Sequence, residues 1–304
     1  MRICSLFSSA TELLYALGLG RSVIGRSERC DYPASVQRKP IVVRSRIDSE
    51  RLSSRGIDAA VQALRRQNAH QYEIDVPLLK RLRPDLLVTQ ELCNVCAASH
   101  PEVEEAIRQL PRKPEVVSVT ARRLDEVEAS IRTLGQATGR LARAKTLSSA
   151  LQQRVKRLQA RVRDVRMRPR VWCVEWLEPL MAGGHWVPEL VAMAGGIDGV
   201  GVAGEDSRRL TWAEVVRYNP EVVLVMPCSF SIARTAKEFP LLSRRPGWPA
   251  LSAVKAGRVF AVEGAFFHRP GPRLVTGLEV MAMLFHPTMF RTPSARYAKR
   301  LPTQ

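Results

Sequence analysis

LKRLRPDLLVTQELC (residues 79–93) and EVVRYNPEVVLVMPC (residues 214–228) follow the same plan. In each, the last residues of a predicted helix are followed by a proline and an acidic residue, then by an apolar run, and a cysteine lies just after that run. An apolar run of this length after a proline predicts a strand buried on both faces, as in parallel sheets. The repetition indicates that the two halves of the chain share one α/β plan.

The neighbouring elements repeat in the same order. TELLYALGLGRSVIG (11–25) and PELVAMAGGIDGVG (188–201) each predict a helix that ends at glycine and is followed by a short strand. Before the first of these helices, Ser9 and Glu12 predict a capping box. Further strands are predicted in RICSLF, KPIVV and PEVVSV and near 171–176, 198–202, 222–227 and 258–262, and further helices over 53–66, 75–82, 101–109 and 123–138.

Residues 140–165 contain neither proline nor glycine and carry one apolar stripe at three- and four-residue steps, which predicts a long helix. A coiled coil is the alternative, but the stripe is shorter than four heptads. We therefore expect an α/β fold of two similar α/β lobes with mostly parallel sheets, joined by one long α-helix, with a ligand cleft between the lobes. The expected boundaries are 1–139 and 169–290 for the lobes, 140–168 for the helix and 291–304 for a tail.

The 304-residue chain has a formal net charge of +18, and only eight of its 47 basic residues are lysines. The charges are dispersed and accompany no zinc-finger, helix-turn-helix or RNA-binding motif, so no nucleic-acid partner is expected. No run approaches the roughly 18–20 apolar residues of a membrane span, so no membrane insertion is expected. Glu12 interrupts the apolar N-terminal run, which has neither a signal-peptide cleavage site nor a lipobox. This favours a cytoplasmic location for the chain as given, and a periplasmic one if the true start lies upstream. A monomer is expected.

Enzyme signatures are absent: the sequence has no G-x-S-x-G, Walker or H-E-x-x-H motif, so no enzymatic activity and no required cofactor are expected. The C-x-x-C pair Cys93 and Cys96 is compatible with zinc, with redox chemistry or with neither. A zinc site normally needs four ligands, and the following helix is predicted to begin after both cysteines, which weakens thiol activation. A thiol-dependent enzyme remains an alternative.

The loops that follow the predicted strands hold most of the unusual side chains. Aromatic residues on such loops indicate a large flat ligand, with packing as the alternative, and His185 and His268 are candidate ligands of a metal or of a cofactor's cobalt. The candidate ligand-binding residues are Tyr32, Arg44, Glu91, Cys93, Cys96, Trp176, His185, Trp186, Phe230, Phe267 and His268.

SLFSSATELLYALGLGRSVIGRSERCDYP, RPDLLVTQELCNVC, WLEPLMAGGHWVPELVAMAGG and PEVVLVMPC together resemble the cobalamin-binding proteins of the periplasmic-binding-protein class with a rigid helical linker, over about residues 1–286. These proteins belong with the siderophore and haem binders of ABC importers. The resemblance implies capture of cobalamin or another corrinoid between two lobes without a chemical step, with Tyr32, Trp176 and Trp186 as aromatic contacts and an ABC permease as partner. A metal, haem or ferric-siderophore binder that uses the same cleft is the alternative.

Overall fold

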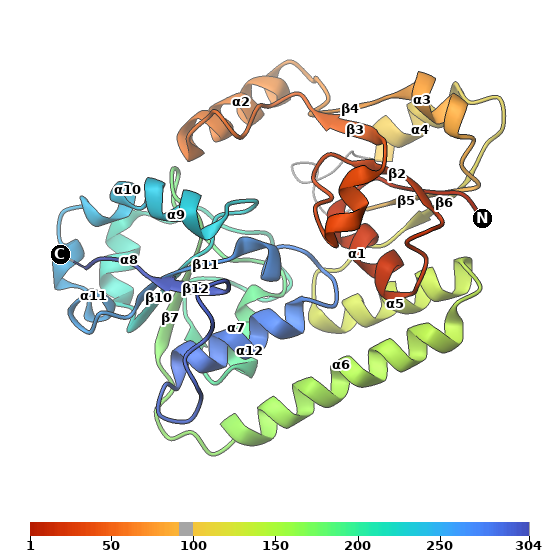
Figure 1. Ribbon diagram of the computed structural model, residues 1–304. Helices are drawn as coiled ribbons and strands as arrows, with labels where there is room; N and C mark the ends of the chain where they lie inside the picture. Colours follow the sequence, from red (N-terminus) through yellow and green to blue (C-terminus); the bar gives the residue numbers. More distant parts are fainter. Residues whose placement is uncertain (91–99, 304) are drawn as a thin grey trace. The chain divides into compact units, whose positions relative to one another are not determined.

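The computed structural model describes residues 1–90 and 100–303, and the chain divides into two compact units. Unit 1 comprises Met1–Leu52, Ala59–Ala121 and Asp125–Ala150, and unit 2 comprises Ser53–Asp58, Arg122–Leu124 and Leu151–Gln304. The long helix predicted between the halves is present as α6 (Leu141–Val162), and the boundary between the units falls within it (Figure 1).

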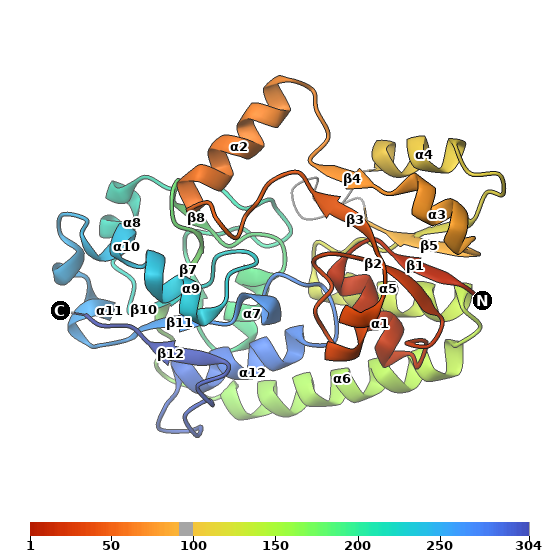
Figure 2. The same ribbon diagram turned by 45° about the horizontal axis from the view of Figure 1, so that its top comes forward.

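Unit 1 is built on a mostly parallel sheet. Among the described residues its strands are β1 (Ile3–Ser5), β2 (Val23–Ser27), β3 (Ile41–Ser45), β4 (Tyr72–Ile74), β5 (Leu86–Thr89) and β6 (Glu115–Ser118), in the order β4-β3-β2-β1-β5-β6, with only β4 antiparallel to its neighbour. Among the described residues up to 139, the helices are α1 (Ser8–Ala16), the 3-10 helix η1 (Ala34–Arg38), α2 (Ser54–Arg66), α3 (Val76–Leu82), α4 (His100–Arg108) and α5 (Leu124–Ala137). The first residues of α2 and α5 are assigned to unit 2. In Figure 2, α3 and α4 lie on one side of the sheet and α1 and α5 on the other.

Unit 2 has a second sheet, in the order β12-β11-β10-β7-β8, and β9 also pairs with β7. Its strands are β7 (Arg170–Trp176), β8 (Met181–Ala182), β9 (Ile197–Asp198), β10 (Val222–Val225), β11 (Val259–Val262) and β12 (Ala298–Arg300). The α-helices are α7 (Val187–Met193), α8 (Trp212–Tyr218), α9 (Ile232–Glu238), α10 (Pro240–Ser243), α11 (Ser252–Lys255) and α12 (Leu274–Phe285), and the 3-10 helices are η2 (Trp248–Ala250) and η3 (Gly264–Phe266).

The repetition seen in the sequence is confirmed by the strand order. The parallel strands run β2-β1-β5-β6 in unit 1 and β9-β7-β10-β11 in unit 2, so each unit places its corresponding strands in the same sequence of neighbours. The two quoted stretches become α3–β5 and α8–β10. In both, the helix ends on a left-handed residue just before the proline, Arg83 (φ 44°) and Asn219 (φ 47°).

The sheet of unit 2 packs helices against both faces. On one face, Trp172 and Val174 of β7 join a buried apolar cluster with Val215 of α8 and Leu242 of α10. The alternate residue Val171 points the other way, where it meets α7 and α12 around Gly196. Side chains of neighbouring residues in a strand point to opposite faces, so β7 is apolar on both.

Two sequence-based expectations differ from the structure. The capping box at Ser9 is wrong: α1 begins at Ser8 with Phe7 as its N-cap, no side chain caps the helix, and Ser9 is buried. Residues 291–304, expected as a tail, include β12, which pairs antiparallel with β11 and covers that edge of the sheet. A three-residue strand such as β12 is too short to show an alternating pattern.

Candidate functional site

Ligands of open α/β sheets bind beyond the carboxyl ends of the parallel strands, so the loops that follow β1, β2 and β3 in unit 1 and β7, β10 and β11 in unit 2 form the candidate sites. Each unit's loops are described in turn. Of the predicted residues, Glu91, Cys93 and Cys96 lie outside the described residues.

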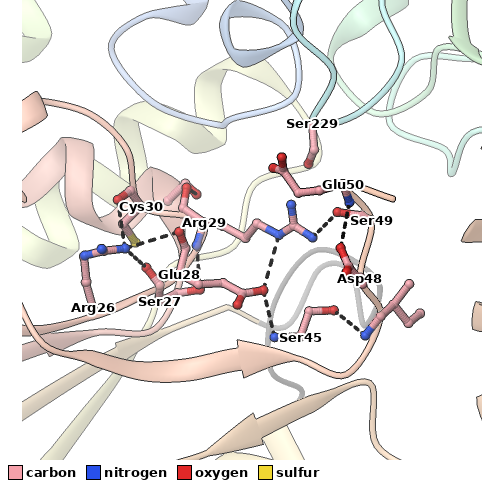
Figure 3. Close-up of polar contacts among 12 residues, drawn as sticks. Arg26, Ser27, Glu28, Arg29, Cys30, Ser45, Asp48, Ser49, Glu50 and Ser229 are labelled. Carbon is pink, nitrogen blue, oxygen red and sulfur yellow. Dashed lines mark hydrogen bonds and ion pairs between the residues drawn. The ribbon is translucent and has the colours of Figure 1, made fainter. Parts of the chain in front are cut away.

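In unit 1, a buried arginine organises the loop after β2. Arg26, the fourth residue of β2, is 8% exposed. Its guanidinium donates to five carbonyl oxygens at 3.1–3.3 Å, those of Ser27, Glu28, Cys30, Gln37 and Lys39. A buried cation needs such acceptors to offset its lost hydration. One side chain therefore fixes the path of the chain from residue 27 to residue 39 (Figure 3).

A second set of contacts ties this loop to those after β1 and β3. The Glu28 Oε1 accepts a hydrogen bond from the backbone N–H of Ser45 at 2.8 Å and lies 3.7 Å from Arg29 Nε. Arg29 donates in turn to the Ser49 hydroxyl at 2.5 Å, and the Ser8 hydroxyl donates to the Arg29 carbonyl at 2.6 Å. Figure 3 shows Arg29 between Glu28 and Ser49. Three loops are thus held as one surface before any ligand arrives.

Tyr32 lies on this loop and has 48% of its surface exposed, as a ligand-contacting aromatic residue requires. Arg44 differs from its predicted place in a loop, because β3 extends to Ser45 and includes it. Arg44 is exposed there, opposite Glu73 of β4. An exposed cation in a strand ending near a loop cannot be told from a loop residue by sequence pattern.

In unit 2, aromatic side chains join the end of β7 to the loop after β10. Trp176 differs from its predicted place in a loop, because it is the last residue of β7. The rings of Trp176 and Phe230 are 5.4 Å apart between centroids, and the Arg234 guanidinium lies 3.7 Å above the Phe230 ring. Phe230 is buried and Trp176 is half-buried. The tilted contact between the two rings and the cation–π contact of Arg234 hold the Trp176 ring at the end of β7, with part of its surface accessible.

The loop after β11 is held by contacts to Trp186, the residue before α7, and to Met226, the residue after β10. The Trp186 indole N–H donates to the Phe267 carbonyl at 2.7 Å, and the His268 Nε2 contacts the carbonyl oxygen of Met226. His185 has a left-handed backbone (φ 52°), and its Nε2 lies 3.2 Å from Asp206 Oδ1. Both histidines therefore have partners on the protein.

The burial of three predicted aromatic contacts supports the packing alternative for them. Trp186, Phe230 and Phe267 are 4%, 1% and 0% exposed. Rings this deeply buried reach a ligand only if the loops rearrange, and in this structure they hold the loops together. Tyr32 and Trp176 are the predicted aromatic side chains with accessible surface.

Metal-binding potential is limited in the part of the chain that is described. Among residues 1–90 and 100–303, no three His, Cys, Asp or Glu side chains are placed to hold a metal ion. Cys4 and Cys173 are buried, and burial raises the pKa of the Cys4 thiol to about 12 and that of Cys173 well above its usual value. Thiols held protonated in this way are poor metal ligands.

The residue that sequence reasoning missed in this region is Arg26. The short strand predicted to follow the helix in the stretch 11–25 is β2. The alternation of side chains along a five-residue strand does not show that its one arginine is buried, so the sequence contains no signal for Arg26.

Two similar α/β units, each with a prearranged loop surface at the carboxyl ends of its strands, define a class of ligand-binding proteins. The chain belongs to the periplasmic binding protein family, whose sequence profile (Peripla_BP_2) matches residues 3–264. Members of this family are substrate-binding proteins of transporters. Among the described residues no helix is both long enough and apolar enough to cross a membrane.

Known proteins are similar over nearly the whole chain. An uncharacterized ABC transporter substrate-binding lipoprotein of Bacillus subtilis, YvrC, is 24% identical over 95% of this chain and 81% of its own length. A vitamin B12-binding protein of Vibrio cholerae is 23% identical over 91% of this chain and 86% of its own. The solved structure of a periplasmic heme-binding protein from Pseudomonas aeruginosa has a TM-score of 0.71 and 21% identity, over 97% of this chain and 96% of that one.

Proposed function

We propose that this protein is the substrate-binding component of an ABC transport system, and that its ligand is cobalamin or a related corrinoid. The observation that carries the proposal is the similarity, over 91% of the chain, to a protein named for vitamin B12 binding. Binding would involve no chemical step. Delivery to an importer requires the outer side of the membrane, so the proposal favours a periplasmic location over a cytoplasmic one.

The loop surfaces suit a large, flat and polar ligand. Tyr32 and Trp176 offer ring faces, and the Arg26 and Arg29 contacts hold their loop in place beforehand. Loops that are already ordered lose less conformational entropy on binding, which leaves more of the contact energy for affinity. Each ring face that stacks on the ligand is expected to contribute about 0.5–1.5 kcal/mol, or about threefold to tenfold in Kd.

Haem is the second candidate, favoured by the heme-binding neighbour and by the available side chains. Haem iron is held in proteins by histidine, cysteine, methionine or tyrosine. Tyr32 and the half-buried His185 and His268 supply two of these ligand types. A corrinoid already carries its cobalt ligands, so it depends less on these groups than haem does.

Parallel titrations distinguish the candidates. Cyanocobalamin, hemin and a ferric hydroxamate are each mixed with micromolar protein and passed through gel filtration, and the absorbance retained with the protein is measured. Retention of the corrin band alone supports the proposal. Retention of hemin alone would replace it with haem binding, and no retained colour would exclude all three ligands.

Variants then test the loop surface. Tyr32→Leu and Trp176→Leu are each expected to weaken cobalamin binding by about threefold to tenfold. Trp212→Leu is the matched control, because Trp212 packs against the core of unit 2 and donates its indole N–H to Pro246. Equal losses in Trp176→Leu and Trp212→Leu would contradict a specific contact at Trp176.

A further inference from the structure

A cationic cavity lies at the amino ends of the parallel strands of unit 1. β1, β5 and β6 are adjacent and parallel, so the residues just before them gather at their amino ends, away from the loops described above. Arg2 precedes β1, the α3–β5 turn precedes β5, and Arg112 lies shortly before β6. Together they line a cavity of about 740 Å³, bounded by Arg2, Lys80, Arg81, Arg83, Asp85 and Arg112.

The charge of this cavity is not balanced from within the protein. Five of its six lining side chains are cations and one is a carboxylate, which leaves a formal charge of +4. Asp85 is already engaged: its Oδ2 accepts the Arg2 backbone N–H at 2.8 Å, and its Oδ1 lies 3.4 Å from Arg112. The Arg2 guanidinium donates to the neutral carbonyl of Leu82 at 2.9 and 2.7 Å, so its charge stays uncompensated.

The remaining three cations have no ionic partner in the part of the chain that the structure describes. No carboxylate lies within 4.0 Å of Lys80, Arg81 or Arg83 there. All three are exposed at the cavity. Like charges held this close repel one another, and an anion placed among them removes that repulsion.

The fold itself does not require all of these cations. Arg2 has a counterpart in Arg170 of unit 2, whose guanidinium likewise donates to a carbonyl of the turn, that of Asn219. Lys80 and Arg81 lie in the last turn of α3, where positive charge favours the negative end of the helix dipole, but this does not account for Arg83 or Arg112. In the corresponding turn of unit 2, Asn219 adopts the conformation of Arg83 and the exposed Val216 stands where unit 1 has Lys80, whereas Arg217 stands where unit 1 has Arg81. The turn therefore forms without the charges of Lys80 and Arg83.

We propose that this cavity binds a phosphate-bearing anion. Guanidinium groups match phosphate oxygens with paired N–H donors, and a lysine ammonium adds a compact charge. A cavity of this volume exceeds a single phosphate, so a di- or triphosphate group or a phospholipid headgroup fits it better. A free di- or triphosphate compound and a phospholipid headgroup would both be recognised through their phosphate oxygens.

The test uses the full chain and sodium tripolyphosphate. The site variant is K80Q/R81Q/R83N, in which asparagine at 83 keeps the left-handed turn seen at Asn219. The control variant, R38Q/R65Q/R66Q, removes the same charge from exposed arginines of unit 1 that do not line the cavity. By calorimetry at low ionic strength, the site variant is expected to bind at least about tenfold more weakly, and the control to change by less than about twofold.

Vesicles separate the two sources. If the protein co-sediments with phosphatidylglycerol vesicles, and this binding is lost in the site variant and displaced by tripolyphosphate, the site binds a headgroup. If the protein binds tripolyphosphate but does not co-sediment, the site binds a free phosphate compound. Equal losses in both variants, or no binding of either probe, would overturn the proposal. Cobalamin binding by the site variant is measured in parallel and is expected to stay unchanged, so the two proposals fail independently.

Discussion

Replacing Arg26 by methionine tests whether one buried cation holds the first loop surface. Methionine fills the volume of the stem but donates no hydrogen bond, so five carbonyl oxygens lose their donor. At about 0.5–1 kcal/mol net for each bond, the loss is about 2.5–5 kcal/mol. Relief of the cost of burying the cation offsets part of it, and we expect unfolding free energy to fall by about 2–4 kcal/mol.

Equilibrium urea unfolding followed by far-ultraviolet circular dichroism measures this change, and Arg38→Met is the matched control. Arg38 ends η1 on the same loop but is exposed, so its replacement is expected to cost less than about 0.5 kcal/mol. Hydrogen exchange locates the effect: amides of residues 27–39 are expected to exchange faster in Arg26→Met. A loss under about 1 kcal/mol, or unchanged exchange there, would refute the reasoning.

Three further predictions concern unit 2. Gly195→Ala is expected to lower the free energy of unfolding by about 2–4 kcal/mol, because Gly195 has φ +82° and an added Cβ would lie 2.7 Å from the His286 ring. The control Gly247→Ala, at φ +83° with nothing within 4 Å of the added Cβ, is expected to lower it by about 1 kcal/mol. Equal losses in urea unfolding would contradict this. Burial raises the pKa of Asp198 from its ordinary value of 3.8, so the folded state binds this proton more tightly than the unfolded state does. The free energy of unfolding is therefore expected to fall as the pH rises through and above 3.8. Asp198→Asn keeps an acceptor for the backbone N–H groups of Gly201 and Val200, and this part of the pH dependence should vanish in it. In a chain whose two cysteines between residues 91 and 99 are serine, a thiol reagent is expected to label Cys228 rapidly and the three buried cysteines only after unfolding; rapid labelling of two or more native thiols would contradict the burial.

The order of elements was predictable because it rests on long-range repetition and on apolar runs, which single residues do not alter. The strands around Leu86 and Val222 were found because a run after proline is buried on both faces. β8 and β12 were not, since two or three residues carry no readable period. The three-residue edge strand β4 is not predicted from the sequence for the same reason.

The sequence predicts which segments follow the strands more reliably than which side chains are accessible there. Of the predicted aromatic residues, Tyr32 in the loop after β2 and Trp176 at the end of β7 have accessible surface. Sequence alone does not distinguish an aromatic ring that faces solvent from one that packs beneath a loop, as Phe267 does. That distinction depends on the path of each loop, and in unit 1 the path of the loop after β2 is set by Arg26.

The corresponding turns at Arg83 and Asn219 have the same shape but differ in charge. Both residues reverse the chain between a helix and a buried strand with nearly equal backbone angles, yet one is cationic and the other neutral. The Asn219 Oδ1 also accepts the Ser252 backbone N–H at 2.9 Å, so turns of the same shape carry side chains with different contacts. Duplicated architecture of this kind lets the two halves of one chain present different surface charge on the same backbone path.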